Sequence, residues 1–216
     1  MHLYLNDTSP FSRVVVATAL LSRCAPLTLV WVDPWSSPTN LKKVNPFCLI
    51  PTIELEDGSS LTESLCICQY LIDTYQPQAI SQVANSRTKE TQQLGFAKTL
   101  MEIAFRSAAL ARYTEKDNEL IKRGKEGIIE ALQQLNQQLR NDGIESYLAE
   151  NLATLYLHVA LDYVQFRHGS LFDEVEHSKI VDFLNESPFS ELLAQVSIEH
   201  LASKPKYAAL LAECSY

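Results

Sequence analysis

The segment TSPFSRV at residues 8–14 decides how the first part of this chain is interpreted. Ser9 is a good helix N-cap and Pro10 suits the first helical position, so the pair predicts a helix start. Residues 12–23 continue that helix, and residues 1–6 before it predict a short strand. The chain is therefore predicted to begin with a strand that leads directly into a capped helix.

The next elements extend this start into a complete small domain. Residues 27–32 are apolar and β-branched and predict a second strand, while residues 35–45 are polar and irregular, with room for one helical turn. Residues 52–55 and 60–62 flank a Gly-containing turn and predict a β-hairpin. Residues 64–75 carry apolar side chains at helical spacing. The order β-α-β followed by β-β-α is the thioredoxin pattern.

The remainder of the chain is predicted to be helical. Six of the nine prolines fall in the first 51 residues, and proline interrupts helices. Helical patterns follow near residues 87–114, 118–142, 151–167, 178–186 and 188–197. The fold class is thus α/β plus all-α, with a thioredoxin-like domain over residues 1–76, a linker over 77–86 and an all-helical domain over 87–216.

Composition limits the classes of partner and compartment. The formal charge of −8 disfavours nucleic acid and anionic membranes as partners through charge. The apolar run at residues 14–21 is too short to span a bilayer, and no basic leader precedes it, so we expect a cytoplasmic protein. The five cysteines lack metal-site or C-x-x-C spacing, and the five histidines form no ligand set, so we expect reduced thiols and no metal.

Three segments together resemble serine-type glutathione S-transferases with a bacterial-like or tau-like N-terminal motif. Residues 8–14 resemble the S-P-F-x-x-R-V helix entry of that superfamily, and NPFCLIP at residues 45–51 resembles its N-P-x-G-K-V-P segment, which ends in a cis-proline. Residues 57–71 resemble its D-G…L-x-E-S-x-x-I-x-x-Y-L element. In the helical half, only NLAT at residues 151–154 loosely matches the [S/T]-x-A-D capping element.

The resemblance implies that glutathione is the co-substrate and that Ser9 stabilises its thiolate. A hydroxyl at this place can donate a hydrogen bond to the sulfur, and the positive end of the adjacent helix also favours an anion. The alternative is that Ser9 is only a helix cap. Ser12, one turn along, is the second candidate and Thr8 a weaker third. Because none of these residues is cysteine, a mixed disulfide with glutathione cannot form at these positions.

Four further residues are implied to bind glutathione. Pro51 is predicted to be cis, which in the superfamily exposes the backbone of the preceding residue, here Ile50, to the cysteinyl part of glutathione. Glu63 is implied to hold the γ-glutamyl ammonium, and Ser64 the neighbouring carboxylate. The alternatives are that Pro51 only starts a strand and that Glu63 only gives a helix an acidic first turn, which is favourable in itself.

The segment at residues 45–51 departs from the superfamily pattern in two places. Cys48 and Leu49 stand where the pattern has Gly and Lys, and that lysine commonly meets the glycyl carboxylate of glutathione. Losing one charge-assisted hydrogen bond costs about 1.5–3 kcal/mol. Lys42 or Lys43 could compensate, or both could be solvated surface lysines.

Two functions follow from the resemblance. The first is a homodimeric glutathione transferase that conjugates glutathione to a small hydrophobic electrophile, bound between the domains, or reduces an organic peroxide. The second is a non-catalytic binding or regulatory protein of the stringent starvation protein A type. The Cys48-Leu49 pair favours the second function, and the Ser9 and Glu63-Ser64 motifs favour the first.

Overall fold

The computed structural model describes residues 1–84, 86–114 and 118–214. Contacts divide the chain into two compact units. The N-terminal unit consists of Met1–Gln82 together with the C-terminal segment from Glu191 onward, and the helical unit is Val83–Ser190. This division follows packing, and the domain boundaries derived from the sequence stay a prediction.

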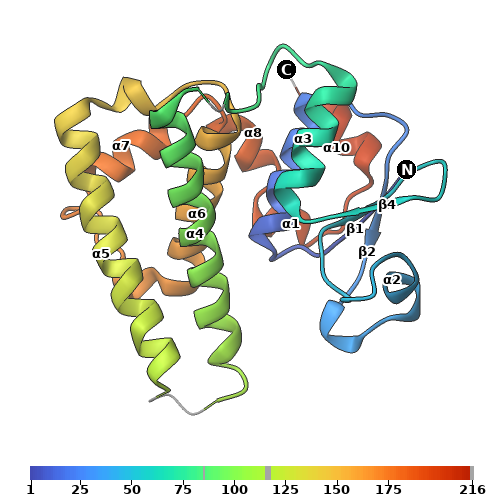
Figure 1. Ribbon diagram of the computed structural model, residues 1–216, viewed down its shortest axis with the longest axis horizontal. Helices are drawn as coiled ribbons and strands as arrows, with labels where there is room; N and C mark the ends of the chain where they lie inside the picture. The colour runs from blue at the N-terminus through green and yellow to red at the C-terminus, as the bar shows by residue number, and fades with distance from the viewer. Residues whose placement is uncertain (85, 115–117, 215–216) are drawn as a thin grey trace. The chain divides into compact units, whose positions relative to one another are not determined.

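The N-terminal unit is built on one mixed four-stranded sheet. Its strands are β1 (His2–Leu5), β2 (Thr28–Trp31), β3 (Thr52–Glu54) and β4 (Ser60–Thr62). Their order is β2-β1-β3-β4, with β1 parallel to β2 and antiparallel to β3, and with β3 antiparallel to β4. The helix between β1 and β2 and the hairpin β3-β4 confirm the predicted thioredoxin-like arrangement (Figure 1).

Two helices pack against each other beside this sheet. Helix α1 (Pro10–Leu21) begins at the predicted Ser9-Pro10 pair, and α3 (Ser64–Tyr75) has the predicted bounds. Nearly all of α1 is buried, and Leu3, Leu5 and Ile53 of the sheet are fully buried with it. The core of this unit therefore lies between the sheet and these two helices.

The link between β2 and β3 contains more helix than the single predicted turn. It holds the 3-10 helix η1 (Pro34–Ser36) and helix α2 (Thr39–Val44). Leu41 of α2 is fully buried, so tertiary packing stabilises a six-residue helix that its own sequence only weakly favours.

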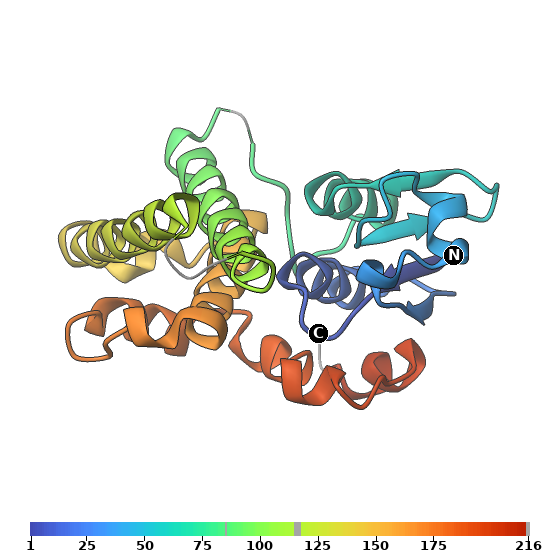
Figure 2. The same ribbon diagram turned by 90° about the horizontal axis from the view of Figure 1, so that it is seen from below.

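The C-terminal segment packs against α1 (Figure 2). It contains most of α8 (Ser190–Gln195), then α9 (Ile198–Leu201) and α10 (Tyr207–Glu213). The guanidinium of Arg13 donates to the carbonyl oxygens of Val196 at 2.8 Å and Leu193 at 3.1 Å. The Tyr207 hydroxyl donates to the Ala19 carbonyl at 2.8 Å. Polar side chains in the core thus join segments about 180 residues apart in sequence.

Long helices form the helical unit. They are α4 (Thr88–Leu110), α5 (Glu119–Asp142), α6 (Leu152–His168) and α7 (Ser178–Glu186), with the short 3-10 helices η2 (Ile144–Tyr147) and η3 (Gly169–Leu171). Helix α4 packs on both α5 and α6. Nearly every side chain of α6 is buried, and Asn151 caps it by accepting hydrogen bonds from the backbone amides of Ala153 and Thr154.

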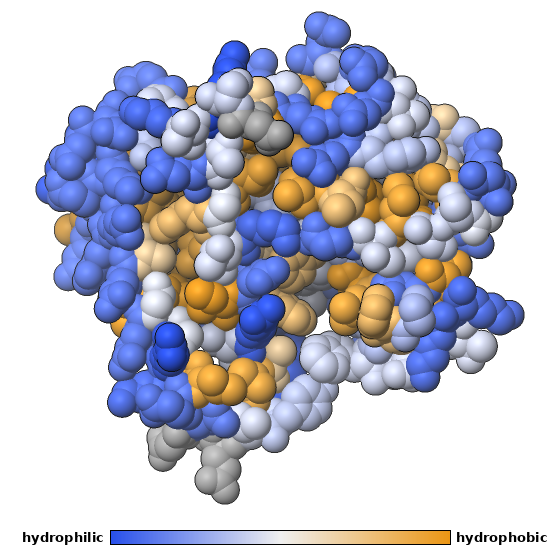
Figure 3. All heavy atoms as spheres, in the orientation of Figure 1, coloured by the Kyte–Doolittle hydropathy of each residue, from blue (hydrophilic) through white to orange (hydrophobic). Residues whose placement is uncertain are grey.

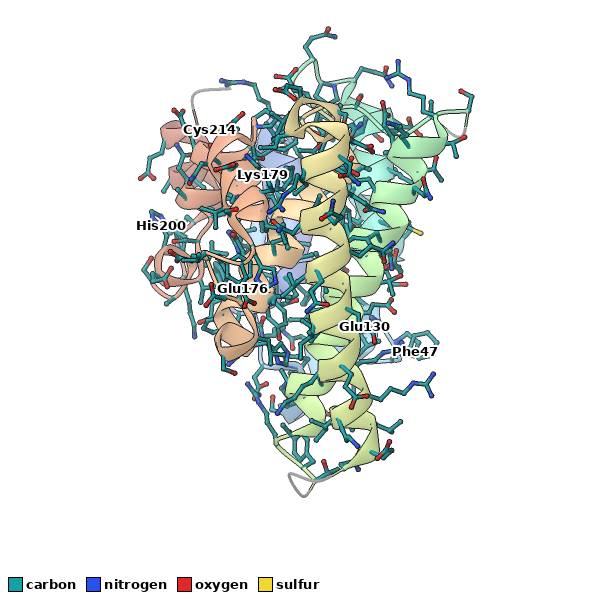
Figure 4. All side chains as sticks on the ribbon, turned by 90° about the vertical axis from the view of Figure 1, so that its left-hand side faces the viewer. Phe47, Glu130, Glu176, Lys179, His200 and Cys214 are labelled. Atoms are coloured by element: carbon teal, nitrogen blue, oxygen red, sulfur yellow. The ribbon has the colours of Figure 1, made fainter. Side chains whose placement is uncertain are left out.

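Helix α5 is strongly amphipathic. Its buried side chains, Ile128 and Leu132 among them, face the rest of the unit, while Glu130 lies on the outer face (Figure 4). Figure 3 shows mainly hydrophilic side chains over this outer face. Among the described residues, no helix is long and apolar enough to cross a bilayer, and no group of three or more His, Cys, Asp or Glu side chains could hold a metal.

Candidate functional site

Strand register gathers the predicted site at one end of the sheet. Tyr4 near the end of β1 pairs with Thr52 at the start of β3, and Thr52 pairs with Thr62 at the end of β4. Ser9 follows β1 after a short loop, Pro51 directly precedes β3, and Glu63 directly follows β4. Three segments that are separated in sequence therefore emerge from adjacent strands at the same end of the sheet.

Ser9 is the N-cap of α1. Its hydroxyl oxygen accepts a hydrogen bond from the backbone amide of Ser12 at 3.2 Å, and its own amide donates to Asn6 Oδ1 at 2.9 Å. Because the Ser9 oxygen acts as the acceptor in the cap, its hydroxyl proton remains available for a second partner. Asn6 fixes the position of Ser9 and was not singled out from the sequence. Its side chain forms a local turn of the kind asparagine commonly supports.

Several backbone groups in the first turn of α1 cannot donate a hydrogen bond to an anion. The amide of Ser12 is taken by Ser9 Oγ and that of Arg13 by the Ser9 carbonyl, while Pro10 has no N–H. The dipole of the helix and the Ser9 hydroxyl therefore carry much of the attraction for an anion. An oxygen that already accepts a hydrogen bond is a stronger donor, because neighbouring hydrogen bonds polarise one another.

The second candidate, Ser12, lies in a different environment. Its side chain is fully buried, and among the described residues its hydroxyl finds no hydrogen-bond partner. The exposed fraction of Ser9 is 8%, and Thr8 is partly exposed. The hydroxyl that a ligand could approach with least rearrangement is therefore that of Ser9 or Thr8.

The peptide bond between Ile50 and Pro51 is cis, as predicted. Another cis bond, Ala25–Pro26, was not predicted. Asn45, the first residue of the NPFCLIP segment, is buried and shapes the loop before Pro51. Its Nδ2 donates at 3.0 Å both to the Leu49 carbonyl and to Thr52 Oγ1, and its Oδ1 accepts from the amide of Phe47. The Asn-Pro pair at 45–46 is the turn signal that could have identified it.

Glu63 caps α3 from an unusual backbone conformation. Its φ of 72° lies in the left-handed region, and its Oε2 accepts a hydrogen bond from the amide of Leu65 at 3.0 Å. The carboxylate is exposed, whereas Ser64 is almost completely buried. The remaining lone pairs of an exposed carboxylate can accept hydrogen bonds from a cationic ligand group.

The two residues that depart from the superfamily pattern have distinct geometries. Cys48 has a φ of 53°, a conformation that glycine adopts without strain, which explains why the pattern carries glycine there. Leu49 is 63% exposed, and Lys42 and Lys43 are exposed on α2. Phe47, 76% exposed, projects outward from the same loop (Figure 4). The loop therefore presents apolar side chains to solvent where the pattern has a cation.

No cysteine occupies the positions of the predicted serines. All five cysteines are free thiols, as expected. Cys66 is exposed and Cys68 is buried, so the two thiols of α3 lie in different environments. Burial raises the pKa of the Cys24 thiol, although a hydrogen bond with Tyr75 opposes this shift. A buried thiol of raised pKa is a poor nucleophile.

Residues 3–79 match the family model of the glutathione S-transferase N-terminal domain. Over these residues the chain is similar to the N-terminal domain of glutathione S-transferases. No curated protein sequence matches the chain significantly. Solved structures with the same fold come from bacteria and fungi, at identities low enough that the likeness concerns the fold alone.

Three solved glutathione transferase structures illustrate this likeness. A family member from Pseudomonas fluorescens Pf-5 with bound glutathione is 20% identical, with a TM-score of 0.72 over 88% of this chain and 97% of that one. A glutathione S-transferase from Methylobacillus flagellatus KT with glutathione bound is 21% identical, with a TM-score of 0.71 and the same coverage. BphK, a bacterial transferase in a ternary complex, is 20% identical, with a TM-score of 0.66 over 99% of this chain and 98% of that one.

Proposed function

We propose that this protein is a glutathione transferase that uses Ser9 to stabilise the glutathione thiolate. The observation that carries the proposal is the strand register, which places Ser9, Pro51 and Glu63 at one end of the sheet. Solved superfamily members with this fold contain bound glutathione. The proposed reaction attaches glutathione to a small hydrophobic electrophile or reduces an organic peroxide.

The chemistry requires a thiolate near neutral pH, where a free aliphatic thiol is mostly protonated. The Ser9 hydroxyl donates a hydrogen bond to the sulfur anion, while its oxygen continues to accept the hydrogen bond from the amide of Ser12. The positive end of α1 lowers the energy of the anion further. The thiolate then forms a carbon–sulfur bond with the electrophile, whose leaving group departs with the electron pair of the broken bond. In the peroxide reaction, two glutathione molecules give the alcohol, water and glutathione disulfide.

Four residues position the tripeptide in this proposal. The backbone of Ile50 before Pro51 pairs with the cysteinyl part. Glu63 accepts hydrogen bonds from the γ-glutamyl ammonium, and Ser64 with its amide holds the adjacent carboxylate. The exposed carboxylate of Glu63 and the N-terminus of α3 suit the two charges of this zwitterionic group. We also propose that the protein works as a cytoplasmic homodimer, the common state in the superfamily.

A second candidate function is supported by the loop at residues 48–49. Leu49 is apolar and 63% exposed at the position where the pattern has a lysine for the glycyl carboxylate of glutathione. An exposed apolar side chain there suits a protein contact better than a charged ligand. This observation favours a non-catalytic binding or regulatory protein, of the stringent starvation protein A type.

Calorimetry with reduced glutathione separates the two functions. A transferase is expected to bind glutathione with a dissociation constant in the millimolar range or below, which appears as a saturable heat of binding. An absence of binding heat at millimolar glutathione would exclude the enzymatic proposal. If the protein binds glutathione but does not conjugate it to a generic aromatic halide, a binding function remains.

Two serine variants then test the role of the hydroxyl. We expect Ser9→Ala to lower kcat/KM for the aromatic halide about 10- to 100-fold, because it removes one hydrogen bond to an anion. Ser12→Ala removes a buried hydroxyl with no partner among the described residues, so we expect less than a twofold change. The ultraviolet absorbance of bound thiolate, followed against pH, should show a higher glutathione pKa in Ser9→Ala. If kcat/KM fell only in Ser12→Ala, Ser12 would be the residue that stabilises the thiolate.

A further inference from the structure

The helical unit contains a recess that is lined by three cationic side chains. Its volume is about 240 Å³, and its lining includes Arg112 just after α4, Lys125 of α5, and Arg167 and His168 at the end of α6. Ser107 of α4 adds a hydroxyl. All of these residues belong to the helical unit, so the recess is independent of the site built on the sheet.

Three permanent positive charges gather here in a chain whose net charge is −8. Within the described ranges, the ion pairs of Lys and Arg involve other side chains and include none from Arg112, Lys125 or Arg167. Like charges that converge repel one another, so the arrangement favours an anion that enters the recess.

His168 contributes a polar but neutral wall. Burial lowers its pKa, and the charges of Lys125 and Arg167 lower it further, while a hydrogen bond to the Ala104 carbonyl opposes the shift. Its Nε2 lies 2.9 Å from that carbonyl oxygen. Because a carbonyl can only accept, Nε2 carries the proton, and the ring is held in a fixed orientation.

Helix dipoles explain only part of the cluster. Arg112 and Arg167 lie at the C-terminal ends of α4 and α6, where cations are favoured in any case. Lys125 lies near the N-terminal end of α5 and receives no such stabilisation. Lys125 is exposed and lines the same recess as the two arginines, so its charge adds to theirs in the attraction of a shared anion.

Parts of the recess are held in place before any ligand binds. The Arg167 guanidinium lies 4.1 Å from the centre of the Phe166 ring. A Cβ atom at Gly124 would collide with Ser107 Oγ, so glycine lets α5 approach the Ser107 side chain. Donors that are fixed in advance lose less entropy when they bind.

We propose that this recess binds a small molecule through a tetrahedral oxyanion, a phosphate or sulfate group. Arginine forks match the oxygens of such a group, and lysine adds a point charge. Three cations match the dianion of a phosphate monoester better than the single charge of a carboxylate.

Calorimetry on the full-length protein without glutathione tests the proposal, with phenyl phosphate, phenyl sulfate, inorganic phosphate and benzoate as probes at low ionic strength. We expect phenyl phosphate to bind saturably, with an affinity about tenfold or more above that of benzoate. Its affinity should fall as salt is added. Comparison of phenyl phosphate with inorganic phosphate shows whether the ligand is an organic ester or the free ion. Benzoate affinity equal to that of phenyl phosphate would contradict a tetrahedral oxyanion site.

Matched double variants separate the recess from general surface charge. Arg112→Gln with Lys125→Gln removes two charges from the recess, and Lys122→Gln with Arg123→Gln removes two exposed charges of α5 outside its lining. We expect at least a tenfold loss of phenyl phosphate affinity in the first and less than twofold in the second. Equal losses in both, or no saturable binding in the wild-type protein, would overturn the proposal. Because the assay contains no glutathione, its outcome does not depend on the proposed transferase activity.

Discussion

The starts of α1 and α3 lie at the same end of the sheet but are built differently. Helix α1 begins at Ser9, a neutral cap that is almost fully buried, and α3 begins at Glu63, a charged cap that is exposed and has a positive φ. Each cap satisfies one backbone amide of its own helix. A neutral hydroxyl retains a proton for an anion, whereas a carboxylate retains lone pairs for a cation. The two helix starts therefore suit the opposite charges of one ligand.

The two starts also differ in how firmly they are held. Arg13, in the first turn of α1, joins this end of the helix to the C-terminal segment through two carbonyl groups. The side chain of Glu63 is exposed, and the residue directly follows the β3-β4 hairpin. We infer that α1 provides a rigid position for the reacting group, while α3 provides an electrostatic contact that can adjust.

The largest effect is expected from Arg13→Met. The variant leaves the carbonyls of Leu193 and Val196 without a charged donor, and each such bond contributes about 1.5–3 kcal/mol. Urea unfolding should show a loss of about 3 kcal/mol or more in the free energy of unfolding. Lys43→Met, at an exposed position of α2, serves as the control and should stay within about 0.5 kcal/mol. Equal stability of the two variants would show that Arg13 does not anchor α1.

An intermediate effect is expected from Glu63→Gln. The amide oxygen of glutamine can still accept from the Leu65 amide, so stability should change little, while the charge for the glutathione ammonium is lost. We expect glutathione affinity to fall about tenfold by calorimetry, and less at high salt. Glu56→Gln removes the same charge at an exposed position of the hairpin turn and should leave affinity unchanged. An unchanged affinity in Glu63→Gln would remove Glu63 from the proposed site.

The smallest effect is expected from Leu49→Lys, which restores the residue of the superfamily pattern. Leu49 is largely exposed, so the change removes little packing. A solvated lysine should tighten glutathione binding by a few-fold, up to about tenfold. Leu49→Met is the control for side-chain length without charge. If Leu49→Lys weakens binding instead, the loop has a role other than contact with the glycyl carboxylate.

The sequence by itself determined the local elements and their order. The Ser9-Pro10 pair predicted the start of α1, and apolar spacing predicted the bounds of α3, because caps and periodic side chains act over a few residues. Asn151 was found in the same way as the cap of α6. The sequence could not show that Arg13 binds two carbonyls about 180 residues away, nor that Ser12 is fully buried and Ser9 is not.

Tertiary structure alone decided which distant residues meet. The pairing of Tyr4 with Thr52 and of Thr52 with Thr62 places the candidate site at one end of the sheet, and this register depends on the packing of whole strands. The basic recess likewise unites Arg112, Lys125 and Arg167 from three helices, none of which carries a recognisable motif. Helix packing brings these charges together because the buried apolar face of each helix fixes its rotation about its own axis. The sequence pattern of one helix does not show which side chains of the other helices will face it.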